Sequence, residues 1–73
     1  MKYEKEFRNF IETCLHDVDT STTQKDRHHA FDMAFGGAWF LMNHIDPNHF
    51  EEYNSIWNEK HEIFRQKGCM QND

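Results

Sequence analysis

The sequence has 73 residues, 37% of them hydrophobic, and a formal net charge of −5, so it can form one small domain at most. It contains no cluster of Lys and Arg and no long apolar run, which disfavours direct nucleic-acid binding and argues against a membrane span. Charged residues interrupt the first apolar positions, so no signal peptide is predicted, and we expect a cytoplasmic protein whose two cysteines are free thiols.

A first helix is predicted over residues 2–18. Its apolar residues are spaced so that they share one helical face: Tyr3, Phe7, Phe10, Ile11, Cys14, Leu15 and Val18. Polar and charged residues fill the remaining positions. Because Cys14 belongs to the apolar face, we expect it to be a protected core residue and not a nucleophile.

A second helix is predicted over residues 22–44. Ser21 or Thr20 is the expected N-cap, and Gln24 follows Ser21 at the spacing of a capping box. One apolar stripe is expected to face the core: Phe31, Ala34, Phe35, Ala38, Leu41, Met42 and Ile45.

A third helix is predicted over residues 47–67, with Asp46 as its N-cap and Pro47 at its first position. Its apolar face consists of Phe50, Tyr53, Ile56, Trp57, Ile63 and Phe64. Gly68 suits the position after the helix, and residues 68–73 are predicted to be a frayed tail that exposes Cys69.

The three helices define the expected fold. The connecting loops are only a few residues long, so consecutive helices should pack antiparallel. The sequence therefore predicts a single all-α domain over residues 1–73, an antiparallel three-helix bundle. No strand-like alternation is flanked by hairpin signals, so β-structure is not expected.

The second helix carries a second apolar face formed by Met33, Gly36, Gly37 and Phe40. Two glycines inside a helix are unfavourable, so their presence calls for a reason. They could fit a close crossing with the third helix, break the helix in two, or allow a second chain to approach. The large number of aromatic residues favours the last alternative, a homodimer formed through these four residues.

Six histidines raise the question of a metal site. His28 and Asp32 are one helical turn apart and could share an ion, with further ligands from His61 or Glu62. The sequence has no HExxH motif and no cysteine pair at zinc spacing, so polar surface histidines are the simpler interpretation. No metal, no cofactor and no catalytic residue are predicted.

The third helix also carries a run of acidic side chains at Glu51, Glu52, Glu59 and Glu62. They could simply keep the protein soluble, or they could dock a basic protein partner. The sequence therefore predicts a small acidic interaction or regulatory module that self-associates and binds a protein partner. The alternatives are a His/Asp metal-binding protein and an acidic inhibitor of a nucleic-acid-binding protein.

Overall fold

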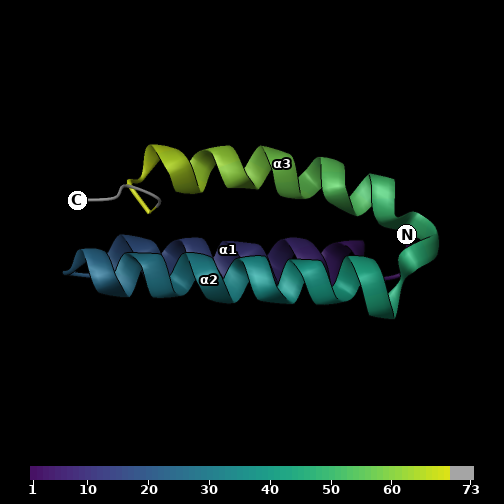
Figure 1. Cartoon of the computed structure of the whole chain (residues 1–73), viewed down its shortest axis with the longest axis horizontal. Coiled ribbons are helices and arrows are strands. Elements are labelled where there is room, and N and C mark those ends of the chain that lie inside the picture. Colours follow the sequence, from purple (N-terminus) through teal and green to yellow (C-terminus); the bar gives the residue numbers. More distant parts are fainter. Residues whose placement is uncertain (70–73) are drawn as a thin grey trace.

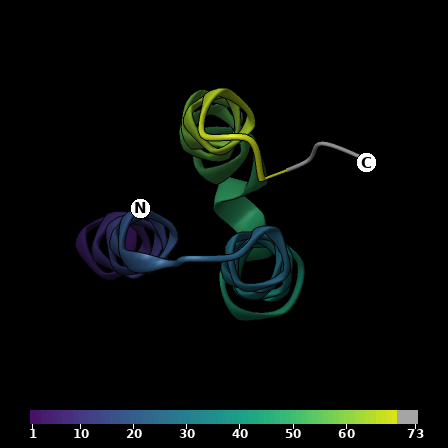
Figure 2. The same cartoon turned by 90° about the vertical axis from the view of Figure 1, so that its left-hand side faces the viewer.

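Three helices, each reversing the direction of the one before, form the protein in a computed structural model that describes residues 1–69 (Figure 1). The elements in chain order are α1 (Glu4–Thr20), α2 (Gln24–Phe40), the π-helical turn η1 (Leu41–Ile45), the 3-10 turn η2 (Pro47–His49) and α3 (Phe50–Gln66). Seen end-on, the helix axes lie at the corners of a triangle (Figure 2). The predicted three-helix bundle is confirmed. Within residues 1–69, no helix is long and apolar enough to cross a membrane.

The predicted N-cap of α2 is wrong, because the hydroxyls of the preceding loop are used differently. The side chain of Thr23 caps the helix by accepting a hydrogen bond from the amide of Asp26 at 3.1 Å. The hydroxyl of Ser21 instead donates to the carbonyl of Asp17 at 2.6 Å, at the end of α1. No capping box forms, since the side-chain amide of Gln24 reaches the far end of the chain.

The core combines small residues of α2 with large residues of the other two helices. Ala30, Ala34 and Ala38 are buried along α2, which lets its neighbours come close. The remaining buried side chains are Phe7, Ile11, Cys14, Leu15, Val18, Phe31, Met42, Tyr53, Ile56, Trp57, Phe64 and Cys69. Most of the predicted apolar stripes are therefore confirmed.

Two residues of the predicted α2 stripe do not belong to the core. Phe35 is 49% exposed and Ile45 is 45% exposed. Phe35 lies at the α3 edge of the stripe, where its ring contacts Trp57 with the ring centroids 6.0 Å apart, and Ile45 lies beyond α2, at the end of η1. The helical wheel identifies an apolar face, but the positions of the neighbouring helices decide how much of that face is covered.

A hydrogen-bond network joins the beginning of the chain to the corner before α3. The buried Tyr53 hydroxyl donates to the carboxylate of Asp46 at 2.7 Å and accepts the amide of Tyr3 at 3.0 Å. The imidazole of His49 is hydrogen-bonded to the other oxygen of the same carboxylate at 3.1 Å. Asp46 and Pro47 occupy the predicted N-cap and first positions, but of the short turn η2 that precedes α3. The Asp46 side chain makes no capping hydrogen bond and instead fixes the corner.

The end of α3 is closed by a Schellman motif. Gly68 adopts a left-handed φ of 82°. Its amide donates a hydrogen bond to the carbonyl of Arg65 at 3.1 Å, and the amide of Cys69 donates to the carbonyl of Phe64 at 3.2 Å. The motif brings the side chains of Cys69 and Phe64 into the core, where both are fully buried. The expected exposure of Cys69 is therefore wrong. The rest of the predicted frayed tail, residues 70–73, lies outside the described residues.

Candidate interaction surface

One side of α2 packs on its neighbours, and the opposite side is both apolar and exposed. Met33, Phe35, Trp39 and Phe40 are each between 49% and 54% exposed. Together with Gly36 they form what we call the α2 outer surface. A large aromatic side chain has roughly 150–250 Å² of surface, so these four offer about 400 Å². Apolar patches of this size on a monomer often have a function.

Gly36 lies at the centre of the α2 outer surface. Met33, Trp39 and Phe40 are three or four residues from it and are therefore its neighbours on the helix surface. A Cβ atom added at Gly36 would have no atom of another residue within 4 Å. The glycine thus leaves a depression bordered by these three large apolar side chains and by the exposed carboxylate of Asp32, four residues before it.

Gly37 has a different environment. A Cβ atom added there would lie 2.5 Å from the ring of Phe10 on α1. This glycine therefore permits a close approach inside the bundle, made with α1 and not with α3 as one alternative proposed. The other alternative, a broken helix, is wrong because α2 runs continuously through both glycines.

A groove borders the α2 outer surface on the side of α1. It has a volume of about 200 Å³ and is lined by Tyr3, Glu6, Phe7, Phe10, Gly37 and Leu41. Drug-sized ligands and cofactors occupy about 300–1,000 Å³, whereas an apolar cavity of about 150 Å³ holds one benzene ring. The groove therefore suits a single apolar side chain and not a cofactor.

The π-helical turn extends the aromatic cluster beyond the end of α2. The amide of Asp46 donates to the carbonyl of Leu41 at 2.9 Å, the five-residue spacing of this turn. The turn places the ring of His44 5.4 Å from that of Trp39 and 5.3 Å from that of Phe40. His44 could not be assigned to this surface from the sequence, since no local pattern distinguishes a π-helical turn from the end of an α-helix.

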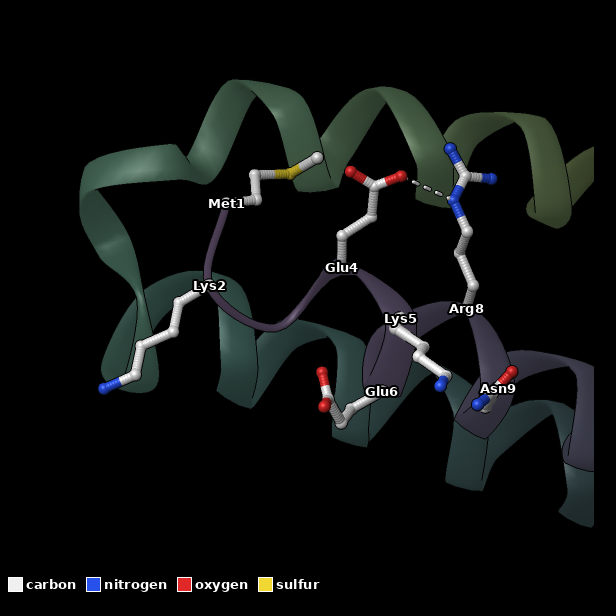
Figure 3. Close-up of a pocket in the computed structure, with 7 residues that line it drawn as sticks. All are labelled: Met1, Lys2, Glu4, Lys5, Glu6, Arg8 and Asn9. Atoms are coloured by element: carbon white, nitrogen blue, oxygen red, sulfur yellow. Dashed lines mark hydrogen bonds and ion pairs between the residues drawn. The ribbon is translucent and has the colours of Figure 1, made fainter.

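A larger hollow than this groove lies elsewhere and has no functional geometry. It measures about 500 Å³ and is lined only by residues from the first nine positions of the chain. Figure 3 shows that these side chains spread outward from one short segment and do not converge on a common point. The single ion pair among them, between Arg8 and Glu4 at 3.1 Å, is exposed. Nothing here positions a nucleophile beside a base.

Of the candidate metal ligands, His28 and Asp32 do lie together, but His28 also has a backbone partner. His28 Nδ1 donates to the carbonyl of Cys69 at 2.9 Å, and its Nε2 lies 3.5 Å from the carboxylate of Asp32. His61 packs against the rings of Phe31 and Trp57. Within residues 1–69, no three His, Cys, Asp or Glu side chains are grouped so that they could hold a metal ion.

The predicted acidic face is exposed but smaller than expected. Glu51, Glu52 and Glu59 are exposed on α3. Glu62 is partly buried and forms two hydrogen bonds with Arg65, of 2.6 and 2.9 Å, which lower its pKa. The Arg65 charge therefore offsets that of Glu62, and three glutamates carry the negative charge of this face.

Comparisons of the chain with protein families, with curated proteins and with solved structures found no match. The geometry of the chain itself is therefore the basis for a functional proposal.

Proposed function

We propose that this protein is a small helical interaction module that self-associates through the α2 outer surface. The observation that supports the proposal is the arrangement around Gly36, where four half-exposed large apolar side chains lie next to an open depression. Burying about 400 Å² of apolar surface on each chain favours association through the hydrophobic effect. The α2 outer surface would form the apolar centre of an interface whose rim is polar.

A second copy of the chain is the proposed occupant of this surface. The same patch contains both the protruding rings and the depression that can receive side chains, so it is complementary to itself. Symmetric dimers are built from such self-complementary patches. A domain of this size also gains stability when it buries further apolar surface by oligomerising.

The dimer can be tested with a matched pair of variants of the full chain. We expect sedimentation velocity to show a dimer that dissociates on dilution between about 100 and 1 µM. Phe40→Ser should yield a monomer with unchanged helical content, because Phe40 is 54% exposed and leaves the core intact. Phe50→Ser removes an exposed ring on α3 and should remain dimeric. A wild-type monomer throughout this range would refute the proposal.

The second part of the proposal is that the acidic α3 face docks a basic protein partner. Lys60, the cation nearest to these glutamates in the sequence, is 15% exposed and reaches across to Glu12 on α1 at 2.5 Å. Its charge is thus directed away from Glu51, Glu52 and Glu59. Such a face attracts a basic partner through long-range electrostatics, an effect that salt screens.

A lysine-rich peptide serves as a probe for this docking face. Replacing Glu51, Glu52 and Glu59 by Gln should weaken its binding at low salt. Replacing the exposed Glu6, Asp17 and Asp26 of α1 and α2 by the corresponding amides changes the net charge equally and should weaken it less. Equal losses in the two triple variants would show that net charge alone attracts the peptide.

A further inference from the structure

We infer that two copies pack their α2 helices antiparallel across the glycine pair, so that Met33 of each copy enters the groove of the other. The inference rests on the proposed self-association and adds its orientation, its register and an occupant for the groove. It follows from three features of α2: the groove on the side of α1, the position of Met33, and the distribution of bulk and charge.

The groove can receive one apolar side chain from another chain. Its walls are the rings of Tyr3, Phe7 and Phe10 together with Gly37 and Leu41. A methionine side chain is flexible, fills irregular apolar spaces and makes favourable contacts with aromatic rings. Met33 is 49% exposed and lies one helical turn before Gly37, too far along α2 to line the groove of its own chain.

An antiparallel dimer brings the partner's Met33 to this place. In such a pair, a residue that precedes the two-fold axis along one α2 faces the residue that follows the axis by the same distance along the other α2. Met33 and Phe40 lie on either side of the glycine pair, each about 5 Å from its midpoint along the helix. The partner's Met33 therefore meets Phe40, the exposed residue next to Gly37 and Leu41.

The orientation also fixes which side of the helix each Met33 contacts. The two-fold axis of an antiparallel pair lies in the interface and is perpendicular to both α2 helices. Rotation about this axis keeps α1 of both copies on the same side of the paired α2 helices. Met33 lies toward α1 in its own copy, so it faces the α1 side of the other copy, where the groove is. A parallel pair would place it on the α3 side, level with Met33 of the first copy and about 9 Å along the helix from Trp39.

Bulk and charge along α2 favour the antiparallel orientation. The half after Gly36 carries Trp39 and Phe40. The half before it carries the slimmer Asp32 and Met33, with Phe35 at the α3 edge, where its ring contacts Trp57. An antiparallel pair sets large residues against smaller ones. A parallel pair would instead place the exposed Lys25 of each copy near its counterpart, where like charges repel.

Disulfide trapping tests the orientation. Met33→Cys and Phe40→Cys are purified separately, mixed at about 1 mM each so that the pair forms despite the loss of the Phe40 ring, and oxidised. The native Cys14 and Cys69 are buried and should not interfere. We expect the mixed disulfide to exceed the two homodimeric disulfides together. Asn58→Cys, on the exposed face of α3, is the control and should not cross-link.

The outcomes separate the inference from the proposed function. Predominant homodimeric disulfides at both positions would indicate a parallel pair and overturn the inference while self-association stands. A wild-type dimer without cross-links at either position would place the interface elsewhere and overturn both. A wild-type monomer would refute self-association itself.

Charge substitutions at Met33 test its place in the groove, because Glu6 is the acidic residue of the lining. Dimerisation of Met33→Glu should be about tenfold weaker than that of Met33→Lys, since only the lysine is attracted by Glu6. The difference should largely disappear when both are combined with Glu6→Gln. An undiminished difference in that background would show that Met33 does not contact the groove.

Discussion

The hydroxyl of Tyr53 donates a hydrogen bond of 2.7 Å to the carboxylate of Asp46, which lies seven residues earlier in the chain. This bond, followed by that of His49, lowers the pKa of Asp46. The carboxylate therefore stays ionised in the folded protein at a pH where it begins to be protonated in the unfolded chain.

The lowered pKa of Asp46 predicts loss of stability in acid. A carboxylate whose pKa is lower in the folded than in the unfolded state stabilises the fold. This contribution is complete at pH values above the unfolded pKa of about 3.9, and it is lost as the pH falls through the folded pKa. The free energy of unfolding, measured with urea between about pH 7 and 3, should decline below about pH 4 in the wild type, and Asp46→Asn should remove part of this decline. Glu51→Gln, on the solvent-exposed face of α3, is the control. Identical pH profiles for Asp46→Asn and the wild type would contradict the assignment.

The two glycines should respond differently to alanine. Gly36→Ala should raise the free energy of unfolding by about 0.5–1 kcal/mol, because helix propensity improves and the new methyl group meets open space. Gly37→Ala should gain less or lose stability, since its methyl group must displace the ring of Phe10. Both are best measured in the Phe40→Ser background, so that self-association does not contribute. Equal gains at the two positions would show that Phe10 moves aside without cost.

A larger side chain at Gly36 should separate folding from association. We expect Gly36→Leu to keep its helical circular dichroism and lose the dimer in sedimentation, because leucine fills the depression that the second copy needs. The same variant would remain dimeric if α2 pairs through another of its faces. Unfolding of the variant would contradict the open space found around Gly36.

The buried thiols provide a local probe of the C-terminal turn. Burial raises the pKa of both Cys14 and Cys69, so both should react slowly with a thiol reagent. Gly68→Ala places a Cβ atom at a positive φ, which costs about 1 kcal/mol and weakens the Schellman motif. Cys69 should then react roughly fivefold faster while Cys14 is unchanged, a difference that timed mass spectrometry can follow. Equal acceleration of both thiols would indicate global destabilisation.

The helices were predictable because each apolar face repeats over several turns, and the burial of Phe7, Ile11 and Leu15 follows directly from that repeat. The separate roles of Gly36 and Gly37 were not predictable. Neighbouring residues point about 100° apart on a helix, and only the position of α1 shows which of the two faces a partner helix. The wheel could group Met33 and Phe40 with them but could not assign each glycine its contact.

Cys69 was missed although the sequence contains a usable signal. A glycine directly after a helix, followed by an apolar residue, is the pattern of a Schellman motif with its hydrophobic contact. The short run of polar residues at the end of the chain suggested fraying and concealed this pattern. The contribution of His44, in contrast, depends on a π-helical turn for which the sequence gives no comparable signal.

The C-terminal turn is also held from α2, and this contact affects how the protein opens. Gln24 and His28, one helical turn apart, donate to the successive carbonyls of Gly68 and Cys69 at 2.7 and 2.9 Å. At the other end of the bundle, Tyr53 accepts the amide of Tyr3. Terminal helices usually exchange their amide hydrogens through local fraying. With the start of α1 tied to α3 and the C-terminal turn tied to α2, the slowest amides of all three helices should exchange together, through a single cooperative opening.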